Sequence, residues 1–181
     1  DANGTIDTPV FNGGFQRGYS LINLPSSVTQ NDLKTQALGT MTNPGSNGIY
    51  VPNNGTSTTG GVYIKGNSTV TMSADGDNSV YTIVQGATTK TITIDNVNNT
   101  TKVQEGASSV TYLGKPDGVG DEGVLIYSSD DITSFSGIVQ KDSTVTVSSE
   151  RDIVISNNVK YEKYTASPLS ANDPATGDPA T

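Results

Sequence analysis

The chain has 181 residues, a formal net charge of −8, and neither His nor Cys. Ser/His/Asp and Cys/His catalysis, zinc–thiolate sites and disulfides are therefore excluded within it. The negative charge, together with the absence of adjacent Lys or Arg residues, disfavours nucleic-acid binding by this domain alone and disfavours an anionic membrane surface. No run of 18 apolar residues is present, so we expect no membrane insertion.

The composition predicts an all-β protein. Thr, Ser, Asn and Gly make up 81 of the 181 residues, and Val and Ile outnumber Leu and Ala by 29 to 16. β-branched residues favour strands, whereas helical proteins are rich in Leu and Ala. Only 32% of the residues are hydrophobic, so we expect a narrow core in which short rows of Val and Ile recur from strand to strand.

The first part of the chain combines an extended segment with one helix. Residues 1–26 are rich in turn-forming residues, and we expect them to be extended. Residues 27–39 are expected to form a short helix, because Leu33 and Ala37 lie four apart on one face and Gly39 supplies a stop. The sequence predicts that this helix caps one end of the β structure.

Residues 48–164 are predicted to form the β domain, with short strands separated by Gly, Asn and Asp. In the segment Ile153-Val154-Ile155, alternation predicts that one face is buried in the core. Residues 73–101 are expected to form a protruding hairpin or meander. Residues 165–181, rich in Pro, Ala, Thr and Asp, are expected to be a linker or tail.

An internal repeat favours one of two all-β architectures. Residues 61–64 and 70–71 align without gaps on residues 123–126 and 132–133 at an offset of 62, and residues 48–51 form a shorter third copy. Short strands with polar corners are typical of a β-solenoid, which stacks repeated strand-and-corner units. The alternative is a β-sandwich, which has longer alternating strands joined as hairpins.

Several phrases in the chain resemble a known bacterial domain. They are Pro9-x-Phe11-Asn12-Gly13-Gly14-Phe15, Ile22-x-Leu24-Pro25, Gly61-Val62-Tyr63-Ile64-Lys65-Gly66-Asn67 and Asp152-Ile153-Val154-Ile155-Ser156-Asn157. Together they resemble the DUF4900-type domain of bacterial envelope and type IV pilus-associated proteins of the Deinococcus–Thermus kind, a family with a β-solenoid DNA-uptake member. The resemblance implies an extracellular or cell-surface location and supplies no catalytic residues.

Acidic residues in Gly-rich turns are the candidate metal ligands. Asp75 and Asp77 flank Gly76, and Asp117 and Asp121 lie in a second Gly-rich stretch. Calcium takes six to eight oxygen ligands, which such turns can offer. The same residues are also the ones that turns prefer for conformational reasons. Calcium is therefore the only cofactor that the sequence suggests.

Tyr161 and Tyr164, interleaved with Lys160 and Lys163, form the only aromatic and basic cluster. They could stack on a sugar ring or close the core as part of a last strand. The sequence favours a non-enzymatic domain that acts as a rigid presenter or adhesin, with other envelope or pilus subunits, itself or a surface glycan as partner. The alternatives are a subunit of a self-assembling filament or layer and, as a minor one, a polysaccharide-active β-helix enzyme.

Overall fold

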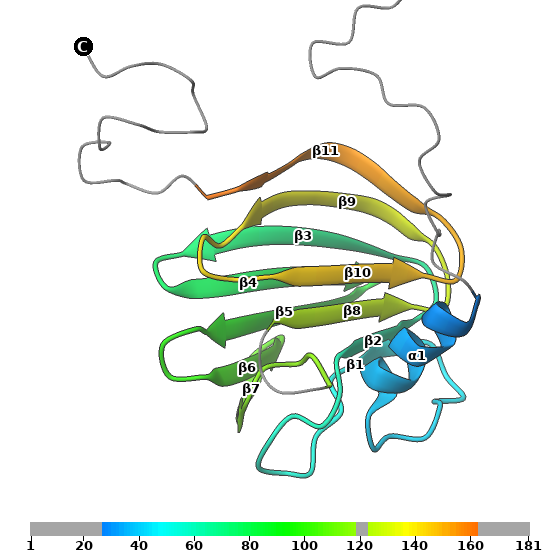
Figure 1. Ribbon diagram of the computed structural model, residues 1–181, viewed down its shortest axis with the longest axis horizontal. Helices are drawn as coiled ribbons and strands as arrows, with labels where there is room; N and C mark the ends of the chain where they lie inside the picture. Colours follow the sequence, from blue (N-terminus) through cyan, green and yellow to red (C-terminus); the bar gives the residue numbers. More distant parts are fainter. Residues whose placement is uncertain (1–26, 119–122, 163–181) are drawn as a thin grey trace, which may run out of the picture.

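The protein is all-β with one short helix, as the composition predicts. A computed structural model describes residues 27–118 and 123–162 (Figure 1). The expected extended segment 1–26 and the expected tail 165–181 lie outside the described residues. The elements in chain order are α1 (Ser27–Leu38), β1 (Gly48–Tyr50), β2 (Val62–Lys65), β3 (Ser68–Asp75), β4 (Asn78–Gln85), β5 (Thr88–Asp95), β6 (Thr100–Glu105), β7 (Ser108–Leu113), β8 (Val124–Ser128), β9 (Ile132–Val139), β10 (Val145–Ser149) and β11 (Ile153–Tyr161).

The strands form two mixed sheets of unequal size. The smaller sheet has the order β1-β2-β8-β10, and the larger has the order β11-β9-β3-β4-β5-β6-β7. In both sheets the parallel pairs involve β8, β9, β10 and β11, whereas the remaining pairs are antiparallel. The helix covers part of the small sheet, and the two described ends of the chain lie near β10 and β11 (Figure 1).

Three segments share one arrangement, namely a strand in the small sheet, a corner and a strand in the large sheet. We call these segments, β2–β3, β8–β9 and β10–β11, units one, two and three. They run parallel, with unit two between the others. Backbone hydrogen bonds between the units continue through the corners, at 2.9–3.1 Å. Between units one and two, the amide of Ser129 donates to the carbonyl oxygen of Ile64, and the amide of Ser68 donates to that of Asp131. Between units two and three, the amide of Glu150 donates to the carbonyl oxygen of Ser128, and the amide of Ile132 donates to that of Asp152.

The internal repeat falls on neighbouring units, in a different register from the sequence alignment. Ile126 pairs with Val62 at a spacing of 64 residues, whereas the repeat has an offset of 62. The spacing of 64 holds for all three residue pairs of β2 and β8, from Val62 with Ile126 to Ile64 with Ser128. Residues 48–51, the third copy, contain β1, which is antiparallel to β2. Unit three instead follows unit two at a spacing of 21, since Val145 pairs with Val124.

Alternation along the strands builds two apolar clusters. In β8, Val124 and Ile126 face the core between the sheets, and Leu125 and Tyr127 lie in the cluster under the helix. All five residues of this strand are buried, because it has a sheet on one side and the helix on the other. The core between the sheets holds fourteen buried apolar residues contributed by strands of both sheets.

The helix covers a face of the small sheet and does not cap the end of the units. It packs against β2 and β8, where Ala37 is fully buried and Leu33 is partly buried. Its position follows from Tyr63 and Tyr127, whose rings lie on the outer face of the small sheet and would otherwise be exposed to water. The helix ends where the sequence predicts, at Gly39, which has a φ of +51°.

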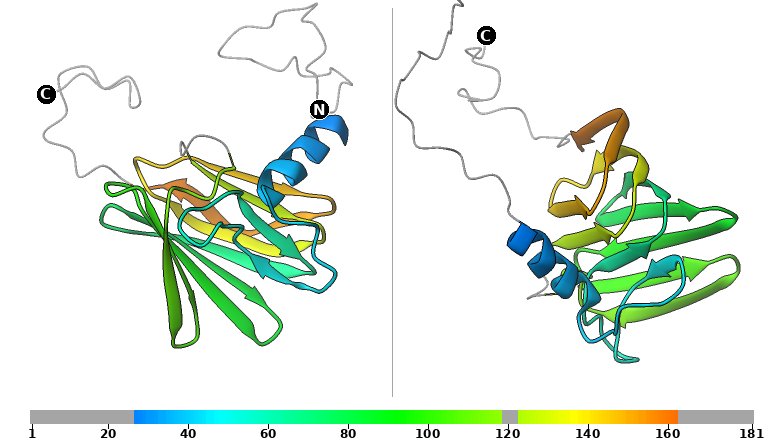
Figure 2. Two further views of the ribbon diagram at one scale, coloured as in Figure 1. Left: turned by 90° about the horizontal axis from the view of Figure 1, so that it is seen from below. Right: turned by 90° about the vertical axis from the view of Figure 1, so that its right-hand side faces the viewer.

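Strands β3 to β7 form an antiparallel meander that is longer than the expected residues 73–101. Three of its hairpins have two-residue turns that begin with Gly76, Gly86 and Gly106, each with a φ between +57° and +59°. A glycine at the first turn position suits the twist of a tight hairpin. The meander projects from the rest of the molecule, as the green strands in Figure 2 (left) show.

The expectation of a buried face at residues 153–155 is wrong. Ile153, Val154 and Ile155 are 38%, 49% and 67% exposed, and every residue of β11 is exposed. The strand pairs with β9 on one side only, because it is the last strand of the large sheet. Alternation along a strand selects a face, but burial of that face also requires another layer or strand to cover it.

The close approach of β9 to β3 is tested by Gly137→Ala. Gly137 has a φ of +122°, and a methyl group added there would overlap the backbone of Met72. We expect a loss of about 2–4 kcal/mol in the free energy of unfolding, measured by urea denaturation. Gly86→Ala is the control, because its φ is +57° in open space, and about 1 kcal/mol is expected. Equal losses of unfolding free energy in the two variants would contradict the close approach of β9 to β3 at Gly137.

Candidate functional site

The acidic residues singled out in the sequence lie in separate places. Asp75 and Asp77 are exposed at the turn between β3 and β4. Asp117 is largely buried in the loop before β8, where its carbonyl oxygen accepts a hydrogen bond from Gln36 at 2.6 Å. Asp121 lies outside the described residues. In the part of the chain that the structure describes, no three Asp or Glu side chains gather as a metal site. Calcium binding stays a prediction.

The two candidate ligand tyrosines belong to the end of β11. Tyr161 is 63% exposed and pairs with Val139 of β9. Tyr164 lies outside the described residues. The structure therefore places Tyr161 on an open strand, and does not use it to close the core.

Sequence reasoning missed the polar contacts that fasten the helix to the corner of unit three. Glu150 accepts hydrogen bonds from the ammonium group of Lys34 at 2.8 Å and from the hydroxyl of Tyr127 at 2.9 Å. The ring of Tyr127 stacks on Tyr63, with ring centres 5.9 Å apart and planes 11° from parallel. These contacts join α1, unit one, unit two and unit three. They hold the helix in place. The sequence gives no indication that Lys34, Tyr127 and Glu150 meet, because they lie in segments far apart in the chain.

The charges at this contact shift three pKa values. The hydrogen bond to Glu150 raises the pKa of Lys34. Burial alone would raise the pKa of Glu150, but the hydrogen bonds from Lys34 and Tyr127 outweigh it, so this pKa lies below its ordinary value. Burial, and then the hydrogen bond to Glu150, raise the pKa of Tyr127. The ionised Glu150 is therefore favoured in the folded protein.

A second surface arises because the large sheet extends beyond the small one. Strand β1, the last of the small sheet, contacts β4, and β5 to β7 continue past it. We call the inner side of this extension the overhang face. It is lined by Lys90, Val103, Glu105, Ser108, Val110 and Tyr112, which enclose a shallow depression of about 170 Å³. Val110 is 52% exposed although it lies on the same side of the sheet as the core.

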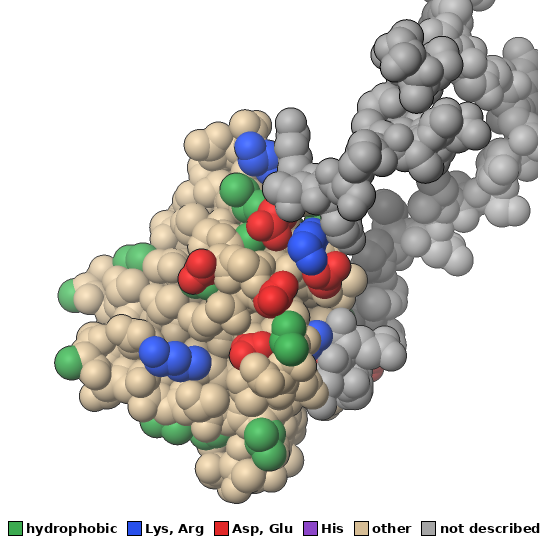
Figure 3. All heavy atoms as spheres, turned by 90° about the vertical axis from the view of Figure 1, so that its left-hand side faces the viewer, with side chains coloured by type: hydrophobic (Ala, Val, Ile, Leu, Met, Phe, Trp, Pro, Cys, Tyr) green, Lys and Arg blue, Asp and Glu red, His purple; other side chains and the backbone are tan. Residues whose placement is uncertain are grey.

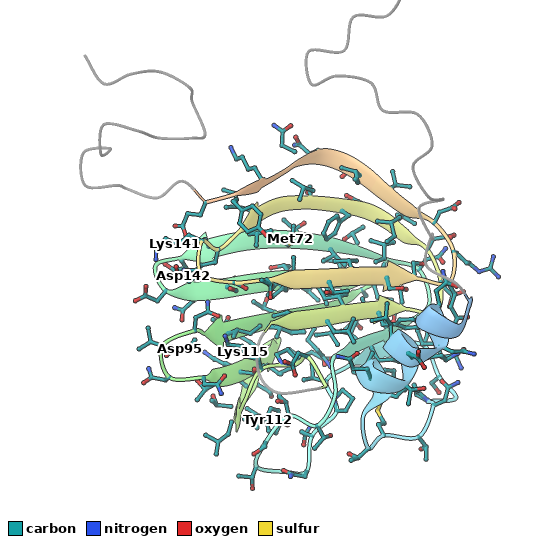
Figure 4. The ribbon with its side chains drawn as sticks, viewed as in Figure 1. Met72, Asp95, Tyr112, Lys115, Lys141 and Asp142 are labelled. Atoms are coloured by element: carbon teal, nitrogen blue, oxygen red, sulfur yellow. The ribbon has the colours of Figure 1, made fainter. Side chains whose placement is uncertain are left out.

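The overhang face combines an aromatic ring with a charged pair and hydroxyl groups. The ammonium group of Lys90 lies 3.1 Å from the carboxylate of Glu105 and donates a hydrogen bond to the carbonyl oxygen of Ile49 at 2.8 Å. Tyr112 lies at the lower edge of the molecule, away from the helix (Figure 4). Aromatic rings flanked by such polar groups can stack on a sugar ring and hydrogen-bond to its hydroxyls. Alternation in β7 places Ser108, Val110 and Tyr112 on one side, and only the fold shows that Ser108 and Val110 are exposed there while Tyr112 is half-buried.

Basic side chains lie singly on the face shown in Figure 3, with acidic side chains between them. Lys34, Lys90 and Lys141 are each paired with a carboxylate. Phosphate backbones are bound by clustered cations. The prediction that this domain does not bind nucleic acid rests on composition and stays a prediction.

Comparison with known proteins gives no match to a protein family, a curated protein or a solved structure. The resemblance to the envelope domain therefore rests on the quoted sequence phrases. In the described residues, the single helix α1 has twelve residues and is too short and too polar to cross a bilayer.

The contribution of the helix anchor is tested by Glu150→Gln. Because the pKa of Glu150 is lowered on folding, its ionised form stabilises the protein above the ordinary carboxyl pKa, and this contribution disappears as the pH falls through the lowered value. At pH 7 the substitution should cost less than about 1 kcal/mol, since the pair is partly exposed. Urea unfolding should show that the difference from the parent chain vanishes once the pH falls below the lowered pKa of Glu150. A difference that persists at low pH would assign the effect to packing.

Proposed function

We propose that this chain is a non-enzymatic extracellular domain of a bacterial envelope or type IV pilus-associated protein, in which a short β-solenoid presents the overhang face to a surface glycan. Other envelope or pilus subunits are the proposed protein partners. The observation that carries the proposal is the stacking of the three parallel units with hydrogen bonds continuous through their corners. Each unit adds one strand to each of the two sheets, as each repeat of a solenoid does.

The stacking supports a presenting role because it makes a rigid base. Strand β8 is buried on both faces, and its parallel neighbours lie on both sides. The meander grows from unit one and extends its sheet by four strands, so the overhang face is held at a fixed distance from the helix. Rigid scaffolds that carry a binding surface at one edge suit an adhesin, because little conformational freedom is lost on binding.

The enzyme alternative is less well supported. Glycoside hydrolysis ordinarily needs two carboxyl groups that face each other across the scissile bond. Of the described residues that line the overhang depression, Glu105 alone carries a carboxylate, and it is paired with Lys90. Arg151, which could stabilise a developing anion, lies instead at the corner of unit three, 3.6 Å from Asp130.

The presenting role is tested with an array of bacterial surface polysaccharides and the labelled chain. We expect Tyr112→Ala to weaken binding by about tenfold, equivalent to about 1.4 kcal/mol, because the stacking surface is removed. Tyr161→Ala is the matched control, since it removes an exposed tyrosine at the opposite edge of the same sheet. Absence of any binding by the parent chain, or equal losses in the two variants, would contradict the role of the overhang face.

The filament alternative is favoured by one observation, the uncovered edge of β11. An open strand edge can pair with another chain. Sedimentation velocity over a wide concentration range separates the two functions. A presenter should remain monomeric at every concentration, whereas a filament subunit should form rods or sheets that grow with concentration.

A further inference from the structure

Charged side chains point toward the inner side of the large sheet at the overhang face. Strand pairing places Ile83, Lys90, Glu105 and Ser108 in one row across β4 to β7. Ile83 is fully buried in the core, whereas the next two positions of the row carry an ammonium group and a carboxylate. Inward-pointing charges are one of the means by which a sheet avoids association with another protein. The overhang face is therefore suited to a small polar ligand and not to an apolar protein partner.

The next row across the sheet forms an apolar floor. It runs from Ile92 in β5 through Val103 in β6 to Val110 in β7. Ile92 is fully buried, Val103 is half-buried and Val110 is 52% exposed. The row thus passes from the core to the open face, so the depression is more enclosed at Val103 than at Val110.

Tyr112 lies on the other side of this floor from the charged row. Ser108, Val110 and Tyr112 alternate along β7, and residues two apart in a strand are separated by about 6.6–6.8 Å. The depression of about 170 Å³ therefore has an aromatic ring on one side and the charged pair with a hydroxyl group on the other. An apolar cavity of about 150 Å³ holds one six-membered ring. The space suits a single pyranose ring, whose C–H face is apolar and whose edge carries polar groups.

The charges of the depression favour a neutral ligand. The ammonium group of Lys90 and the carboxylate of Glu105 lie 3.1 Å apart and compensate each other. An anionic sugar would have to displace Glu105 from Lys90, and it would approach a chain of net charge −8. Like charges that are brought together on binding cost free energy and disfavour the partner that carries them. Uronic acids and phosphorylated sugars are therefore poor ligands for this surface.

The charged pair offers a hydrogen-bond donor and an acceptor next to an apolar side chain. The ammonium group of Lys90 can donate three hydrogen bonds, one of which goes to the carbonyl oxygen of Ile49. The side chain of Glu105 is 56% exposed, and its carboxylate accepts hydrogen bonds only. An acetamido group has one carbonyl acceptor, one N–H donor and one methyl group, which match Lys90, Glu105 and Val103. A sugar hydroxyl matches the first two of these residues but leaves Val103 uncovered.

We propose that the overhang depression binds one N-acetylated amino-sugar ring of a neutral glycan. The ring lies over Val110 beside Tyr112, and its acetyl methyl group contacts Val103. The amide carbonyl accepts a hydrogen bond from Lys90, and the amide N–H donates one to Glu105. This inference rests on the proposed function, because it names the sugar that the presented surface recognises.

The first test is titration calorimetry of the full chain with β-1,4-linked tetramers of N-acetylglucosamine, of glucose and of glucuronic acid. We expect the N-acetylated tetramer to bind about tenfold more tightly than the glucose tetramer, because one added apolar group in a fitted site gives a factor of this size. Equal affinities for these two would overturn the inference and leave the presenting role standing. Binding to the polysaccharide array but to none of the tetramers would overturn it in the same way. Absence of binding to the tetramers and to the array would contradict the proposed function itself.

The second test locates the acetyl methyl group with Val103→Thr, which exchanges one methyl group of the side chain for a hydroxyl group. We expect the affinity for the N-acetylated tetramer to fall by about tenfold and the affinity for the glucose tetramer to change by less than about twofold. Val97→Thr is the control, because it makes the same exchange at a residue that is 71% exposed in the turn between β5 and β6. Urea unfolding checks that both variants fold. Equal losses of affinity for the two tetramers would overturn the inference.

The third test changes the charge of the site at nearly constant shape with Glu105→Gln, a residue exposed enough for the variant to fold. The variant leaves the ammonium group of Lys90 without its carboxylate, so we expect the glucuronic acid tetramer to bind about tenfold more tightly than it binds the parent chain. Glu150→Gln is the matched control, because it makes the same change in net charge at the corner of unit three. No gain in the Glu105 variant, or an equal gain in both variants, would overturn the assignment of the ligand to the pair of Lys90 and Glu105.

Discussion

The stacking of parallel units is the constraint on which the rest of the structure depends. Unit two has a neighbour on each side, and its strand β8 is buried on both faces. The hydrogen bonds at the corners fix how far each unit slides along the next, because the amide of one corner residue must meet the carbonyl oxygen of its neighbour. Once this register is set, Val62, Ile126 and Val147 share one inward row, and Val124 lies beside Val145 in the next.

The two uncovered surfaces have a common origin in the unequal sizes of the sheets and the finite number of units. The large sheet has seven strands and the small sheet four. The excess strands on one side form the overhang face, where Val110 is exposed and Tyr112 is half-buried. On the other side, unit three ends the described stack and leaves β11 without a neighbour. Both surfaces are inner faces of a sheet, so both are more apolar than the outer surface of a polar chain.

The helix has a structural part in this arrangement. Its apolar residues cover Tyr63 and Tyr127, and Lys34 ties it to Glu150 at the corner of unit three. Because the anchor uses side chains from all three units, it links the helix to the register of the stack. An element of twelve residues thereby connects the packing of the small sheet to the register of the three units.

The sequence by itself determined the all-β class, the short helix that stops at Gly39 and the strand segments, because β-branched residues, turn residues and alternation act locally. It also pointed to the neighbouring strands through the repeat of residues 61–64 and 123–126. Only the tertiary structure decided that residues 153–155 are exposed and that the helix covers a sheet face. It also decided that Val110 and Tyr112 lie on the overhang face and that Asp75 and Asp117 lie apart. Those outcomes depend on which strands pair across 21 to 64 residues of chain and on what lies opposite each face. No local pattern contains that information.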